Sequence, residues 1–222
     1  MREYTRSHNQ RTAPERIGRQ PHISNFATQT VSMEGEKMYL YNESDELSGN
    51  SFSNANTDGA RSVLIAFDSL PQTLEEFASL TTARMVSPFD TAAMLIAALC
   101  NYPYNKSESI AMVNYLKGPS PLAPWEETFI ANRLRDKDYL PTSYFIGAAP
   151  HNGYAPSAPY MVMVTDDGPD SYTEDNTATL YLQSGGADSP CEVQLQRADD
   201  DKWYLIAYKL LPEIRAPELR NS

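Results

Sequence analysis

The stretch SPFDTAAMLIAALC, residues 87–100, predicts a helix that is apolar on nearly every side. Ser87 suits the N-cap position and Pro88 the first helical position, while Asp90 places an acid in the first turn, where the helix dipole favours negative charge. A helix without a polar face must be buried on most sides. We therefore expect the other elements of the fold to pack around residues 87–100.

Three further helices are predicted on the two sides of this stretch. Thr73 and Glu76 form a capping-box pair that opens a short helix ending near residue 80. Ser107 is expected to cap a second helix, which Gly118 ends. Pro124 starts a third helix, WEETFIANRLRDK, whose inward face is expected to hold Trp125, Phe129, Ile130 and Leu134.

The last third of the chain predicts an antiparallel meander with strands over residues 160–165, 178–183, 191–197 and 202–210. Within the third strand, Cys191, Val193 and Leu195 alternate with polar residues, as in a half-buried strand. The last strand, KWYLIAYKL, is apolar on both faces, which indicates a central strand or one that helices cover. Trp203 is expected in the helix–sheet core, where truncation to Ala costs about 3–5 kcal/mol.

The remaining segments complete an α+β fold class, with N-terminal helices packed on a C-terminal antiparallel β-meander. Strands are expected over residues 62–67 (SVLIAF) and 37–41, and residues 42–58, rich in Ser, Asn, Gly and Asp, predict a loop. The expected organisation is a flexible basic arm over residues 1–32, a single α+β domain over 33–215 and a tail over 216–222. Met33, where the composition changes, is a candidate alternative start.

Charge is distributed unevenly along the chain. Five arginines against two glutamates give residues 1–22 a net charge of +3, and since the whole chain carries −11, the remainder carries −14. This acidic body repels phosphate backbones, so nucleic acid is not expected as a partner. No stretch approaches the ~20 apolar residues that span a bilayer, and no apolar segment of a secretory signal follows the N-terminal arginines. Cytoplasmic localisation without a membrane partner is predicted.

The two cysteines, Cys100 and Cys191, are too few for a disulfide framework in a chain of 222 residues. Cys100 ends the apolar helix and Cys191 opens a predicted strand. We expect both to be unpaired, buried thiols that react slowly.

Candidate catalytic residues are sparse. His151, the one histidine outside the arm, could act as a general base with Asp166 or Asp167 in a hydrolase-like enzyme, or it could be a turn residue beside Asn152-Gly153. No GxSxG, HExxH, CxxC or phosphate-binding glycine loop occurs, so no metal and no cofactor are expected. Five acidic residues could bind a calcium ion through their oxygens, but a solvated connection between two strands is the simpler interpretation. These residues are Asp166, Asp167, Asp170, Glu174 and Asp175.

A Tyr- and Pro-rich segment, residues 139–160, is the best candidate for a ligand or partner surface. Its rigid aromatic rings, Tyr144, Tyr154 and Tyr160, can bind at a low entropic cost, with His151 beside them. Core packing is the alternative role for most of these rings. The leading hypothesis is therefore a non-catalytic binding or protein-interaction module of unknown ligand, partner and oligomeric state, and the alternative is the enzyme with His151 as general base.

The stretches SPFDTAAMLIAALC, LPTSYFIGAAPHNGYAPSAPY, SGGADSPCEVQLQR and KWYLIAYKLL carry a resemblance that runs from about Ser87 to Pro212. Together they resemble an uncharacterised bacterial family known only as a domain of unknown function, which implies a bacterial origin and one α+β domain but no activity. More loosely, helices followed by a meander with a Trp-bearing last strand are similar to the NTF2-like cone fold. That similarity rests on element order alone and implies no function.

Overall fold

The computed structural model describes residues 32–33, 36–37, 51–55, 59–211 and 213–218. The predicted arm apart from residue 32, residues 38–41 of the strand predicted over 37–41, and the end of the tail lie outside these residues. The helices are α1 (Leu74–Ser79), α2 (Pro88–Cys100), α3 (Lys106–Lys117), α4 (Pro124–Leu134) and α5 (Tyr139–Thr142), with 3-10 turns η1 (Thr81–Arg84), η2 (Pro150–Asn152) and η3 (Gly168–Ser171).

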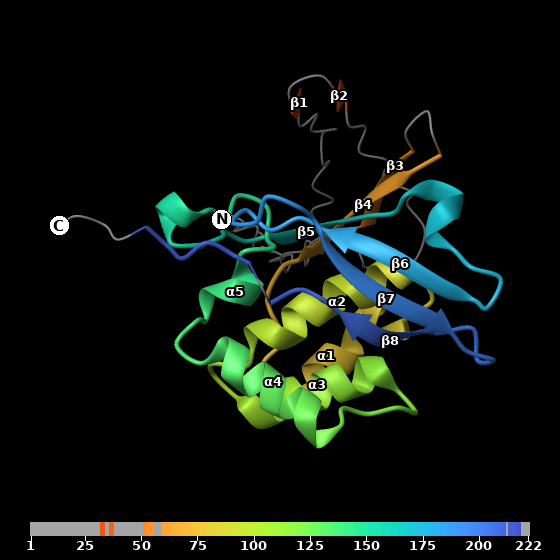
Figure 1. Cartoon of the computed structure of the whole chain (residues 1–222), viewed down its shortest axis with the longest axis horizontal. Helices are drawn as coiled ribbons and strands as arrows, with labels where there is room; N and C mark the ends of the chain where they lie inside the picture. The colour runs from red at the N-terminus through yellow and green to blue at the C-terminus, as the bar shows by residue number, and fades with distance from the viewer. Residues whose placement is uncertain (1–31, 34–35, 38–50, 56–58, 212, 219–222) are drawn as a thin grey trace, which may run out of the picture.

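Helix α2 lies at the centre of the fold, as its composition predicts. Every residue of α2 except Asp90 is buried. In Figure 1 the main sheet passes along one side of α2 and the helices α1, α3 and α4 lie on the other. Aliphatic side chains from both layers meet on α2, among them Ile65, Val164 and Leu195 from the sheet. The α+β fold class is therefore confirmed.

The main sheet is antiparallel and its strands follow one another in chain order from β3 to β8. Strands β5 to β8 follow one another through short connections, whereas the connection between the neighbouring strands β4 and β5 contains the helices α1 to α5. The predicted meander is confirmed, and β4 extends it at its N-terminal side. The strands are β3 (Ser51–Ala55), β4 (Arg61–Phe67), β5 (Tyr160–Thr165), β6 (Thr177–Leu182), β7 (Cys191–Arg197) and β8 (Trp203–Tyr208), and a separate two-stranded pair is formed by β1 (Ser32–Met33) and β2 (Glu36–Lys37).

Two predicted boundaries are wrong. Residues 51–55, placed in a loop by their composition, form strand β3, whose residues pair with β4 from Ser51 opposite Ile65 to Ala55 opposite Arg61. Backbone pairing with an existing strand can outweigh weak local strand propensity. Helix α3 begins one residue before Ser107, because Asn105 is its N-cap and accepts a hydrogen bond from the Glu108 backbone N–H at 3.2 Å.

Strand β8 is an edge strand, and helices cover its outer edge. The Trp203 N–H donates to the Met85 carbonyl at 2.8 Å, and the Thr91 hydroxyl donates to the Trp203 carbonyl at 2.8 Å. Further along, Lys117 Nζ donates to the Ile206 carbonyl at 3.4 Å. The prediction of a strand covered by helices is thus confirmed, and the central position is wrong. Trp203 packs against the core but stays half-buried, so the fully internal side chain of β8 is Leu205.

Within the part of the chain that the structure describes, no helix is long and apolar enough to cross a membrane.

Candidate functional site

The Tyr- and Pro-rich segment contributes most of its rings to the interior. Tyr144 is buried and donates its hydroxyl hydrogen to the Leu210 carbonyl at 2.5 Å, and burial raises the pKa of this phenol. Tyr154 is buried too, and its hydroxyl donates to the Arg215 carbonyl at 2.7 Å. The half-buried ring of Tyr160 packs against Phe145 at a centroid distance of 5.4 Å. Tyr144 and Tyr154 therefore have no ring face free for a partner.

Two glycines explain how this segment reaches the core. A side chain at Gly185 would lie 1.9 Å from the Ala148 carbonyl oxygen, and one at Gly186 would lie 2.0 Å from the Tyr154 hydroxyl. Only glycine permits such an approach of two segments. The connection between β6 and β7 therefore packs directly against the Tyr- and Pro-rich segment.

His151 lies in η2, where its side chain is exposed. Among the described residues it makes no hydrogen bond and no ion pair. The neighbouring turn is held by Asn152, whose side chain accepts from the Ala149 N–H at 3.0 Å and donates to the Gly147 carbonyl at 2.8 Å. His151 is thus an exposed turn residue, and the described residues show no hydrogen bond or ion pair between it and Asp166 or Asp167.

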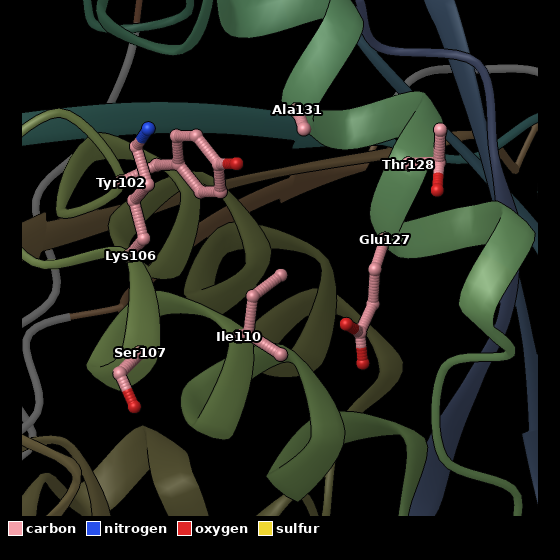
Figure 2. Close-up of a pocket in the computed structure, with 7 residues that line it drawn as sticks. All are labelled: Tyr102, Lys106, Ser107, Ile110, Glu127, Thr128 and Ala131. Carbon is pink, nitrogen blue, oxygen red and sulfur yellow. The ribbon is translucent and has the colours of Figure 1, made fainter.

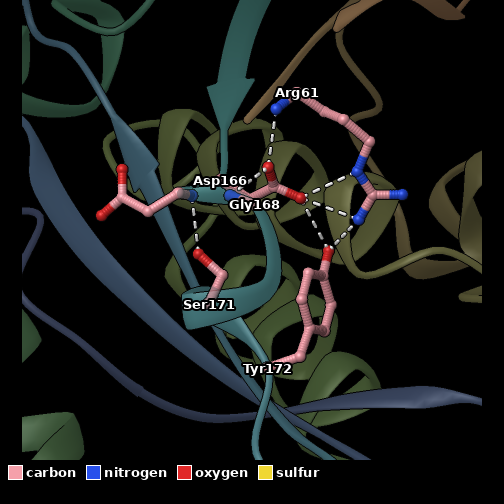
Figure 3. Close-up of polar contacts among 6 residues, drawn as sticks. Arg61, Asp166, Gly168, Ser171 and Tyr172 are labelled. Carbon is pink, nitrogen blue, oxygen red and sulfur yellow. Dashed lines mark hydrogen bonds and ion pairs between the residues drawn. The ribbon is translucent and has the colours of Figure 1, made fainter. Parts of the chain in front are cut away.

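Asp166 is held in a network of donors at the end of β5. Its carboxylate accepts from the Arg61 backbone N–H at 2.7 Å and from Arg61 Nε at 2.9 Å. The Tyr172 hydroxyl and the Gly168 N–H donate to it at 3.0 and 3.1 Å. Figure 3 shows these groups converging on the carboxylate. The backbone N–H of the adjacent Asp167 donates to the Ser171 hydroxyl at 2.8 Å.

Electrostatics explains why this network is stable. Burial alone would raise the pKa of Asp166, but hydrogen bonds from Arg61, Gly168 and Tyr172 outweigh burial and lower it. The Arg61 guanidinium also lies 5.1 Å from the Phe89 ring centroid and 5.4 Å from that of Tyr172. With its acceptor atoms already occupied, Asp166 is a structural group that joins β4 to the end of β5.

The neighbouring acids do not combine with Asp166 into a metal centre. Across the described ranges, no group of three or more His, Cys, Asp or Glu side chains is placed to hold a metal ion. Asp170 and Glu174 are exposed, as expected of a solvated strand connection.

Helix α4 exposes two aromatic side chains that were predicted to face the core. Ile130 and Leu134 are buried, as predicted, but Trp125 is 71% exposed and Phe129 is 38% exposed. Residues four apart lie on one side of a helix, so Trp125, Phe129 and Arg133 form a single stripe, which we call the α4 stripe. The predicted inward positions of Trp125 and Phe129 are wrong, because apolar character alone does not determine the face of the helix on which a residue lies. At about 100° per residue, Trp125 and Phe129 lie roughly 100° to 180° around the helix from Ile130 and Leu134, and that spacing could have separated the two pairs.

The α4 stripe ends in a cation. The Arg133 guanidinium lies 5.3 Å from the Phe129 ring centroid. Arg133 forms no ion pair with any carboxylate in the described part of the chain. The first turn of α4 is anchored elsewhere, because Lys117 Nζ donates to Glu126 at 3.1 Å and also holds the Ile206 carbonyl of β8. The stripe is therefore carried on a well-anchored helix and faces away from the core.

The opposite flank of α4 borders a shallow hollow of about 460 Å³ against α3, shown in Figure 2. Lys106 lies with its ammonium 5.7 Å from the Tyr102 ring centroid at one end of this hollow. Burial and the negative charge of Glu127 raise the pKa of Tyr102. The lining residues are Tyr102, Lys106, Ser107, Ile110, Glu127, Thr128 and Ala131. Ser107 is thus part of a surface hollow and does not cap α3.

Comparison with known proteins adds a family. No curated protein and no solved structure matches the chain, so the similarity to the NTF2-like fold stays a prediction, as does a bacterial origin. One family model, described as a domain of unknown function (DUF6935), matches residues 69–218. The matched range includes α1 to α5 and β5 to β8, and with them the α4 stripe. Because this match covers more than half of the sequence, the chain belongs to the family of the domain of unknown function DUF6935.

Proposed function

We propose that this chain is a non-catalytic protein-interaction module and that its contact surface is the α4 stripe, in place of the Tyr- and Pro-rich segment. The observation that carries the proposal is the exposure of Trp125, one of two tryptophans in the chain. Tryptophan has the largest apolar surface of any side chain and is highly buried on average. A tryptophan left on the surface by the fold is typical of a residue that a partner covers.

The composition of the stripe supports the same function. Tryptophan and arginine are among the residues most enriched at the energetic centres of protein interfaces. The Phe129 ring between them adds apolar surface, and Arg133 brings a charge that no described carboxylate neutralises. Helix α4 holds these side chains on a rigid element, which reduces the entropy lost on binding.

The alternative function, a hydrolase-like enzyme with His151 as general base, would need a carboxylate or substrate group positioned beside this histidine. His151 is exposed in a turn, and the candidate carboxylate of Asp166 is already held by Arg61 and Tyr172. No contact among the described residues favours this enzyme. The net charge of −11 disfavours nucleic acid as a partner. Two cysteines without a disulfide are compatible with a cytoplasmic module.

Affinity capture tests the proposal directly. Tagged full-length chain would be incubated with extract of its source organism, and the proteins that co-purify would be quantified for wild type, Trp125→Ala and Tyr104→Ala. Tyr104 is a matched control because it is 82% exposed and lies outside the α4 stripe. We expect the Trp125 variant to lose at least about tenfold of the specific partner, consistent with an interface residue worth more than 1.4 kcal/mol. Equal recovery by wild type and Trp125→Ala would contradict the proposed function.

A further inference from the structure

The α4 stripe is symmetric in spacing and complementary in chemistry about its middle residue. Trp125 lies four residues before Phe129, and Arg133 lies four residues after it. With a rise of about 1.5 Å per residue, both lie about 6 Å from Phe129 along the helix axis. A second α4 running antiparallel would therefore bring the two Phe129 rings together and put Trp125 of one copy opposite Arg133 of the other.

We infer that the partner of the α4 stripe is a second copy of this chain, bound through an antiparallel pair of α4 helices. The inference rests on the proposed function of the stripe. A two-fold interface uses one self-complementary patch on both subunits, and the α4 stripe meets that requirement. Each Trp125 ring would cover the Arg133 guanidinium of the second copy, a favourable cation–π arrangement. The guanidinium already lies on Phe129 in the free chain, so it is held in place for this contact.

Electrostatics selects the antiparallel orientation. In a parallel pair each Arg133 would face the other Arg133, and like charges at close range disfavour association. In the antiparallel pair the two guanidinium groups lie about 12 Å apart along the axis, which exceeds the Debye length of about 8 Å at physiological ionic strength. Each cation is instead opposite an aromatic ring.

The size of the α4 stripe and the net charge of the chain determine how tightly two copies are expected to bind. Stable interfaces bury about 1,200–2,000 Å² in total, and three exposed side chains per copy supply only part of that area. Each copy also carries a net charge of −11, so the two copies repel each other at low salt. We therefore expect a concentration-dependent dimer in the micromolar range that added salt strengthens.

Sedimentation velocity of the full-length chain tests the inference, from about 1 µM to about 300 µM, a range that brackets micromolar dissociation constants. The wild type should change from monomer to dimer over this range, and more readily at about 500 mM salt than at about 50 mM. Trp125→Arg should remain monomeric because it puts two arginines opposite each other. Tyr104→Ala, the exposed control, should dimerise like the wild type.

An exchange of the two side chains makes the test specific for the antiparallel pair. The double substitution Trp125→Arg with Arg133→Trp keeps one ring and one cation in each contact, so it should restore the dimer that Trp125→Arg loses. A wild type that is monomeric at every concentration, or a double variant that is folded by circular dichroism but monomeric, would overturn the inference. If the wild type stays monomeric and yet captures a different protein through Trp125, the proposed function stands and only the second copy is excluded.

Discussion

Asp166 and Arg61, which are 105 residues apart in the sequence, form an ion pair of 2.7 Å between a fully buried carboxylate and a half-exposed guanidinium. The pair joins the first residue of β4 to the end of β5. Since the Arg61 backbone N–H donates to the same carboxylate, the contact orients both the main chain and the side chain. Asp166 thereby fixes the register of two neighbouring strands that cover α2.

We expect Asp166→Asn to lower the free energy of unfolding by about 2–4 kcal/mol, because one partner of a buried ion pair is removed and its donors lose an acceptor. Urea denaturation at pH 7 measures this change. The matched control is Asp201→Asn, which removes an exposed ion pair to Arg197 of 3.0 Å and should change stability by less than about 0.5 kcal/mol. Equal effects of the two substitutions would show that the Asp166 network does not hold the strands.

Asp90 provides a prediction about pH. It is the one residue of α2 that is not buried outright, yet burial raises its pKa to about 6. A raised carboxyl pKa means that the folded state binds the proton more tightly than the unfolded state, whose pKa is about 3.9. The stability contributed by Asp90 is therefore fully present below about pH 4 and is lost as the pH rises through about 6.

Asp90→Asn should consequently be more stable than the wild type at pH 7, by about 1–3 kcal/mol, with the difference vanishing near pH 4. The favourable interaction of the charged carboxylate with the N-terminus of α2, about 0.3–1 kcal/mol, works in the opposite direction and is the smaller effect. Thermal unfolding between pH 4 and 8 measures the difference. A variant that is less stable than wild type at pH 7 would mean that the helix dipole outweighs the desolvation of Asp90.

The two thiols should differ in reactivity. Cys100 is buried, and burial raises its pKa far above the usual range, so its reactive thiolate is disfavoured. Cys191, expected from the sequence to be buried, is only half-buried and lines a hollow of about 310 Å³ beside Pro190 and Lys209. An aromatic disulfide reagent should modify one thiol in the native protein at pH 8 and two after unfolding. Cys191→Ser should abolish the native modification, and its persistence would contradict the different burial of the two cysteines.

The central helix and the meander could be predicted from the sequence because each has a strong local signal. The apolar stretch over residues 87–100 has no polar face, and the alternation from Cys191 to Leu195 has the period of a strand. Strand β3 and the Asp166–Arg61 pair could not be predicted in this way, because each depends on a partner distant in sequence. Sequence spacing likewise gives no sign that Gly186 lies against Tyr154.

For the candidate site, the sequence predicts the burial of several aromatic side chains wrongly. Aromatic character predicts a contact surface at Tyr144 and Tyr154, which the fold buries. It also predicts that Trp125 and Phe129 lie in the core, although both are exposed. Composition alone cannot distinguish an aromatic ring that packs in the core from one that stays exposed on the surface. The angular position on α4 does distinguish them, because Ile130 and Leu134 define the buried flank.

The central claim is that the Trp125 ring is exposed to solvent in the monomer and is buried when a partner binds. In full-length Trp203→Phe chain, Trp125 is the only tryptophan and its fluorescence reports its surroundings. The account predicts a long emission wavelength and ready quenching by iodide in dilute solution, and a shorter wavelength with protection from iodide once the partner, including a second copy at high concentration, is bound. Protection from iodide already in the dilute monomer would contradict the account, because Trp125 would then be packed within its own fold.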